Sequence, residues 1–191
     1  MGFFLKRSIT LAELLIAIAL LGLLIIAIFS LDNYARFHLI TSDRRARLQN
    51  EAFLCVEQMV KDAIRGIGYV GDPAVLSVPS VYCTSTELRI RVDNGNGQID
   101  STSAAGGDFM VRFNRNGNDL EYYPDYIRNS TQFEVLTRKV VNPAGVDIFN
   151  CSGGLIRIEL MLRHRPAASS SLENPQFQMI SRLYSRSESV Q

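Results

Sequence analysis

The hydrophobic pattern of the chain begins with one long apolar run. Between Leu14 and Leu31 nothing is ionisable, and only Gly22 and Ser30 interrupt the series of Ala, Ile, Leu and Phe residues. Counted from Ile9, the run is long enough to cross the hydrocarbon core of a bilayer, which takes about 20 residues as a helix. The run therefore predicts a membrane-spanning helix.

Charges on either side of this run predict its orientation. Lys6 and Arg7 precede it and Asp32 follows it, so the positive-inside rule leaves the N-terminus in the cytoplasm and exports the rest of the chain. A secretory signal peptide is the alternative, but its apolar region is usually only about 7 to 15 residues long, and no small-residue A-x-A site follows the run. We expect a single-pass protein of the inner (cytoplasmic) membrane with an exported C-terminal domain.

Apolar residues recur at helical spacing in the next part of the chain, residues 43–67. This spacing predicts an amphipathic helix, and its expected buried face consists of Phe53, Val56, Val60, Ile64 and Ile67. Residues 34–42 contain neither Pro nor Gly, which favours one continuous, bent helix over two helices joined by a loop.

Three glycines, Gly66, Gly68 and Gly71, form the sequence GIGYVG at the end of this helix. They match the dinucleotide-binding fingerprint G-x-G-x-x-G, but that fingerprint requires a strand before the glycines and a helix after them. Here a helix precedes them, so we interpret them as a helix C-cap and turn.

Beyond Pro73 the pattern changes to short runs typical of strands. The predicted strands are residues 76–82, 88–92, 109–114, 120–123, 155–162 and 177–184. In the fifth, apolar residues alternate with Arg157, Glu159, Met161 and Arg163, which predicts a sheet with one packed face and one hydrated face. The Asn-Gly pair at residues 116–117 predicts a hairpin turn between the third and fourth strands. The expected fold class is α+β with a mainly antiparallel sheet.

The N-terminal sequence KRS-ITLAELLIAIALLGLLI resembles the class III leader of type IV prepilins and type II secretion pseudopilins. The resemblance places a prepilin peptidase cut after Ser8, makes Ile9 the N-methylated first residue of the mature chain, and makes Glu13 its fifth. Ser8 stands where the family usually has Gly, and Ile9 stands where it usually has Phe or Met. A free amine at Ile9 can pair with Glu13 of a neighbouring subunit, because two charges that are each costly in an apolar environment become tolerable together.

Later segments extend the resemblance to PilW-like minor pilins and, more distantly, to J-type minor pseudopilins. They include the helix RLQNEAF, the hairpin FMVRFNRNGNDLEYY, the segment LTRKVVNPAGVDIF and the strand LIRIELMLR. The resemblance implies the type IV pilin fold: a leader (1–8), a membrane-spanning or filament-core helix (9–31), the exported half of the helix with its turn (32–71) and a β-rich domain (72–191). Its expected partners are a prepilin peptidase, the inner membrane, and other pilins or minor pilins contacted through the N-terminal helix.

Three functions fit these features. The first is a structural minor pilin that helps to initiate type IV pilus assembly at or near the tip. The second is a minor pseudopilin of a type II secretion system. The third is a membrane-anchored binding protein that never polymerises. Processing of the leader by a prepilin peptidase distinguishes the third from the other two.

Residues 93–100 are the one site-like motif of the exported part. The sequence DNGNGQID resembles a D-x-N-G-D-G-x-I-D calcium loop with one residue missing, and Asp93, Asn94, Asn96 and Asp100 can supply the oxygen ligands that calcium prefers. However, Asn96 replaces the usual acidic residue and no bidentate Glu follows. An Asx/Gly turn between strands is therefore favoured over a calcium site.

Three cysteines lie on the exported side, where disulfides are permitted. Cys83 and Cys151 lie in the sheet region and can pair, whereas Cys55 is expected in the buried face of the helix. Three unpaired thiols are the equally weighted alternative. His38 and His164 are isolated, and we expect both to be solvated or packed side chains.

Composition narrows the function further. The chain has 191 residues, of which 47% are hydrophobic and 20% charged, and its net charge is +1; this balance fits one globular domain with an apolar anchor and does not indicate nucleic acid as a partner. The sequence has no G-x-S-x-G, no H-E-x-x-H and no P-loop, so we do not expect an enzyme. The only low-complexity stretch, residues 167–171, is predicted to be a flexible loop.

Overall fold

The computed structural model describes residues 10–66, 81–96, 106–143, 145–152 and 155–184. The chain divides into two compact units, Met1–Ser42 and Asp43–Gln191. The fold is α+β, with one long N-terminal helix that packs against antiparallel sheets, and the fold class predicted from the sequence is confirmed.

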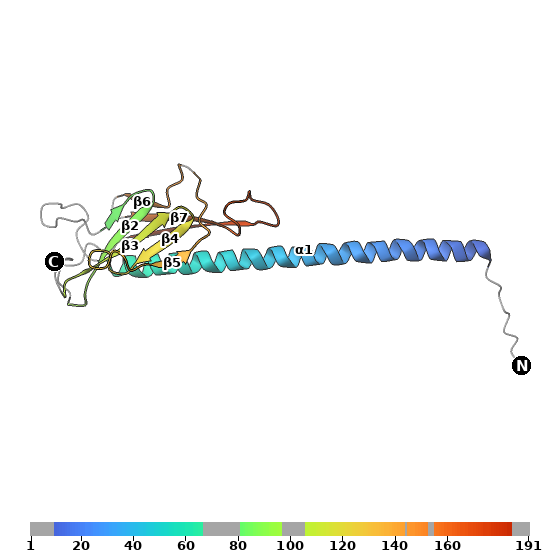
Figure 1. Ribbon diagram of the computed structural model, residues 1–191, viewed down its shortest axis with the longest axis horizontal. Coiled ribbons are helices and arrows are strands. Elements are labelled where there is room, and N and C mark those ends of the chain that lie inside the picture. The colour runs from blue at the N-terminus through green and yellow to red at the C-terminus, as the bar shows by residue number, and fades with distance from the viewer. Residues whose placement is uncertain (1–9, 67–80, 97–105, 144, 153–154, 185–191) are drawn as a thin grey trace, which may run out of the picture. The chain divides into compact units, whose positions relative to one another are not determined.

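Helix α1 runs without interruption from Leu11–Ile64, over 54 residues (Figure 1). The continuous helix expected from the absence of Pro and Gly between residues 34 and 42 is therefore present. In the first unit its apolar side chains are exposed, and the most apolar part of the helix has a mean hydropathy of 3.1 with none of it buried. By length and composition this is a helix that can cross a membrane.

The second unit contains two antiparallel sheets. In the five-stranded sheet each strand pairs with the next along the chain, in the order β1 (Val81–Cys83), β2 (Glu87–Val92), β3 (Phe109–Asn116), β4 (Asp119–Tyr123) and β5 (Glu134–Thr137). The three-stranded sheet consists of β6 (Phe149–Ser152), β7 (Leu155–Arg163) and β8 (Gln176–Tyr184). In β7 buried and half-buried residues alternate along the whole strand, as its sequence pattern predicted.

Strands β5 and β6 were not among the strands predicted from the sequence. Each is only four residues long. In β6 only Phe149 is buried, so the strand has no alternation to detect. Both strands form because a neighbour, β4 or β7, offers an edge with free backbone groups to pair with.

The hairpin between β3 and β4 forms where the sequence predicted it, with a different pair of loop residues. Asn116 pairs with Asp119, so the two loop residues are Gly117 and Asn118. Only Gly117 has a positive φ, of 62°, and a glycine in that first loop position is the pattern of a type II′ turn.

The side of α1 that faces the sheets agrees with the predicted one in part, since Val56 is buried and Val60 packs against the core. Of the expected residues, Phe53 and Ile64 are 53% and 54% exposed, and Ile67 lies outside the described residues. The buried apolar residues of the helix are Leu48, Ala52, Cys55, Val56, Met59 and Ala63. They pack with strand residues such as Leu88, Ile90 and Phe113 in one core. Ala52, Met59 and Ala63 continue the helical spacing of Val56, and Phe53, one residue after Ala52, lies off this face.

The end of α1 also corrects the interpretation of its first glycine. Gly66 follows the helix directly, but it does not have the positive φ of a left-handed C-cap. It forms an isolated β-bridge with Val92, and a Cβ atom there would lie 3.0 Å from Ile90 Cγ2. Gly66 is needed for close approach to β2, while Gly68 and Gly71 lie outside the described residues.

Candidate functional site

The start of α1 holds the residues that the leader motif singled out. Ser8 and Ile9 lie outside the described residues. Thr10 and Glu13 form a reciprocal capping box: the Thr10 backbone N–H donates to Glu13 Oε2 at 2.9 Å, and the Glu13 N–H donates to Thr10 Oγ1 at 3.3 Å. The Thr10 hydroxyl also donates to Glu13 Oε2, at 3.0 Å.

This capping box gives Glu13 an intramolecular role at the helix terminus. A carboxylate at the third helical position satisfies a backbone N–H that no helical carbonyl can reach, and it complements the positive end of the helix dipole. The T-x-x-E spacing ahead of an apolar run is itself a capping-box signal. Thr10 could therefore have been identified from the sequence as the partner of Glu13.

The second unit contains a disulfide between Cys83 and Cys151, with Cα atoms 5.9 Å apart. Cys83 lies on β1 and Cys151 on β6, so the bond joins an edge strand of the five-stranded sheet to an edge strand of the three-stranded sheet. This is the pairing that the sequence left open.

Cys55 has the environment that its place in the helix predicted. It is a free thiol and 2% exposed. Burial, followed by the nearby charge of Glu51, raises its pKa to about 12. A protonated thiol in an apolar core is unreactive, so Cys55 is a core residue.

The proposed calcium loop is only partly described by the structure. Asp93 Oδ1 accepts a hydrogen bond from the Gly95 N–H at 2.9 Å, and Asn94 Oδ1 accepts one from the Asn96 N–H at 3.0 Å. These are Asx turns. Asp100 lies outside the described residues, and the Asx/Gly turn favoured from the sequence remains the prediction for this segment.

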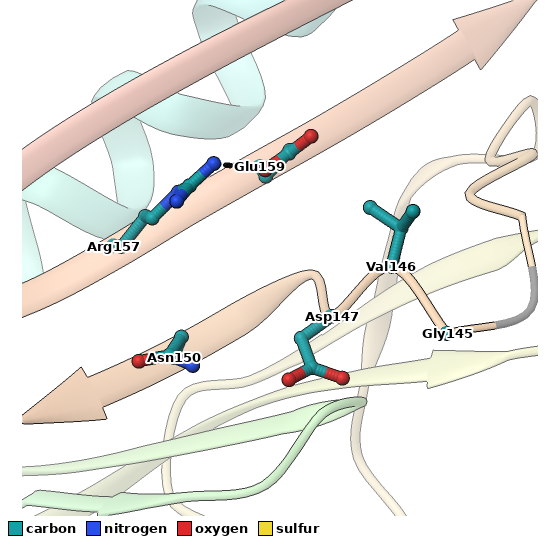
Figure 2. Close-up of a pocket in the computed structure, with 6 residues that line it drawn as sticks. All are labelled: Gly145, Val146, Asp147, Asn150, Arg157 and Glu159. Carbon is teal, nitrogen blue, oxygen red and sulfur yellow. Dashed lines mark hydrogen bonds and ion pairs between the residues drawn. The ribbon is translucent and has the colours of Figure 1, made fainter.

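A depression of about 330 Å³ lies beside the three-stranded sheet. It is lined by Gly145, Val146, Asp147, Asn150, Arg157 and Glu159 (Figure 2). The Arg157 and Glu159 side chains come from β7 and form an ion pair, with 2.6 Å between Nη2 and Oε2. The lining includes two carboxylates, Asp147 and Glu159, and no His, Cys or Ser.

The two histidines lie in different surroundings. The His38 ring packs against Tyr34, with 4.2 Å between ring centroids, and His164 is half-buried just after β7. Within the described part of the chain, no three His, Cys, Asp or Glu side chains gather where they could hold a metal ion.

Comparison with known proteins yields no match to a family model, a curated protein or a solved structure. The architecture nevertheless defines a class. A long apolar N-terminal helix whose C-terminal part packs on disulfide-linked antiparallel sheets is pilin-like.

Proposed function

We propose that this protein is a membrane-anchored structural subunit of the pilin type. The observation that carries the proposal is the difference in burial between the two parts of α1. Its N-terminal part exposes a continuous apolar surface on which Glu13 is the only charge before Asp32, while its C-terminal part is buried in the core of the second unit. An exposed apolar helix of this length needs lipid or other apolar helices around it.

Glu13 can make the packing of that helix against neighbouring helices specific. Insertion scales assign a carboxylate about 3 kcal/mol at the centre of a spanning helix, and less near its end. The bonds from Thr10 reduce this cost for an unassembled subunit. Cleavage after Ser8 would create an amine at Ile9, and the amine of an adjacent subunit would then neutralise the carboxylate and select the packing register.

The specific role that we infer is that of a PilW-like minor pilin, which helps to start assembly of a type IV pilus at or near its tip. We expect no catalytic activity. The resemblance of the leader and of the later strand segments supports this role. A minor pseudopilin of a type II secretion system is the second candidate, since the same leader and fold serve both machineries.

The experiment measures where the mature chain begins and how much of it enters filaments. N-terminal sequencing should begin at Ile9 when a prepilin peptidase is present, and a mature chain beginning elsewhere would remove the cleavage site from the proposal. Glu13→Ala should leave the protein in the membrane with its disulfide formed but reduce its amount in sheared filaments. Glu57→Ala is the matched control, because Glu57 is an exposed glutamate on the same helix in the second unit.

Two other outcomes would redirect the proposal. A chain that keeps its leader in the presence of the peptidase would favour a non-polymerising membrane-anchored binding protein. Equal incorporation of Glu13→Ala and the native protein would contradict the charge-pairing argument while leaving the anchor intact.

A further inference from the structure

Several cations gather around His164, at the C-terminal end of β7. Burial lowers the pKa of His164, and it is lowered further by the positive charges of Arg44, Lys139, Arg165 and Arg47. These residues come from α1, from the segment after β5 and from the segment after β7. Segments far apart in the sequence therefore bring their charges to one place.

Hydrogen bonds hold together the segments that carry these cations. An Arg44 guanidinium N–H donates to the backbone carbonyl of Glu173. The Arg163 N–H donates to the Lys139 carbonyl at 2.9 Å. The Arg165 N–H donates to Asn174 Oδ1 at 2.7 Å. We call the cations on these neighbouring segments the basic cluster: Arg44, Arg47, Lys139, Arg163 and Arg165.

Only part of this charge is neutralised. Arg47 pairs with Asp43, and Lys139 pairs with Glu51. None of the ion pairs in the described residues involves Arg44, Arg163 or Arg165. Arg163 donates instead to neutral groups, the Gln176 side chain and the Ala168 carbonyl. The cluster consequently keeps a net positive charge.

A loop beside the cluster presents a leucine side chain to solvent. Asn174, which is 5% exposed, holds the loop from within by donating to the carbonyls of Arg165 and Ser169 at 3.0 and 2.9 Å. The stretch 167–171, predicted to be flexible, is thus tied to a buried side chain. Leu172 is 62% exposed on this loop. An exposed leucine next to unpaired arginines combines the two interactions that bind a protein to a charged bilayer surface.

The position of Arg44 in the chain favours a membrane as the partner. Arg44 is the second residue of the unit Asp43–Gln191, and only 12 residues separate it from Leu31, the last residue of the apolar run. The cluster is therefore attached by a short segment to the part of the chain that we expect in the bilayer. Docking to the membrane that holds α1 would be intramolecular, and an intramolecular second contact needs less affinity than an intermolecular one.

We propose that the basic cluster and Leu172 form a docking surface for anionic lipid headgroups of the membrane that holds α1. The proposal rests on the membrane anchorage proposed above. Each Arg near an anionic surface contributes about 1 kcal/mol, which corresponds to about a fivefold change in the docked fraction relative to the undocked one. The interaction should weaken with salt, since exposed charges are screened.

The chain offers a clean reporter because it contains no Trp. The full-length chain carrying Leu172→Trp is placed in nanodiscs of phosphatidylcholine alone or of phosphatidylcholine mixed with phosphatidylglycerol. Quenching of the Trp by lipids spin-labelled near the headgroup reports docking. We expect quenching in the anionic discs at low salt and its loss at high salt. Adding Arg165→Gln should lower the docked-to-undocked ratio about fivefold, while Arg165→Lys retains it.

The control is Arg65→Gln, which removes an exposed arginine just after the end of α1 and should leave the quenching unchanged. Equal quenching in neutral and anionic discs, or an equal loss in Arg65→Gln, would overturn the proposal. A signal that depends on two chains per disc rather than on lipid charge would also overturn it and indicate a contact between subunits. A chain that does not enter nanodiscs at all would contradict the membrane anchor itself, which is a separate failure.

Discussion

Removal of the disulfide is the sharpest test of how the second unit is held together. Cys83 and Cys151 are 68 residues apart in sequence, and the loop that they close contains β2 to β5. The chain-entropy relation for a loop of this size gives a stabilisation of about 4.4 kcal/mol at 25 °C. For a unit of this length each kcal/mol corresponds to about 2–4 °C in Tm, so the double variant Cys83→Ser, Cys151→Ser should unfold about 10 °C or more below the native protein.

The assay is thermal unfolding followed by circular dichroism on the full chain in detergent, with and without reductant. Reductant should lower the Tm of the native protein to that of the double variant and leave the double variant unchanged. Cys55→Ala is the matched control: it removes a buried thiol that forms no disulfide, so this variant should still respond to reductant. A native Tm that is insensitive to reductant, or a double variant as stable as the native protein, would refute the reasoning.

Three further outcomes are expected. Gly66→Ala should destabilise the second unit by about 1–3 kcal/mol in denaturant unfolding, because its Cβ would lie 3.0 Å from Ile90 Cγ2; Gly22→Ala, with open space around it, should not. Burial raises the pKa of the Asp62 carboxyl above 3.8, so the ionised carboxylate destabilises the folded chain at neutral pH. Asp62→Asn should therefore raise the free energy of unfolding at neutral pH, and this increase should fade as the pH falls towards 3.8. An increase that is the same at both pH values would contradict this account. Millimolar calcium should shift Tm by less than about 2 °C, and a larger shift abolished by Asp93→Ala would establish a calcium site.

The sequence by itself determined the elements that carry a strong periodic signal. The apolar run, together with the absence of Pro and Gly between residues 34 and 42, predicted one continuous helix, and α1 is such a helix. The alternation of β7 predicted its buried face correctly, since a strand places successive side chains on opposite sides whatever it packs against. The helix start was not predicted, although the spacing of Thr10 and Glu13 marks it, because a capping box is a local interaction.

Only the tertiary structure determined the features that depend on contacts between segments far apart in the sequence. Helical spacing was predicted correctly, but which side of α1 faces the sheets depends on the strands that it packs against, and Phe53 is exposed while Ala52 is buried. Gly66 owes its role to Ile90, which is distant in sequence. The basic cluster does not appear in the sequence as one run of charge, because its cations come from segments that are far apart along the chain. Cys83 and Cys151 became a specific pair only once β1 and β6 were adjacent edges.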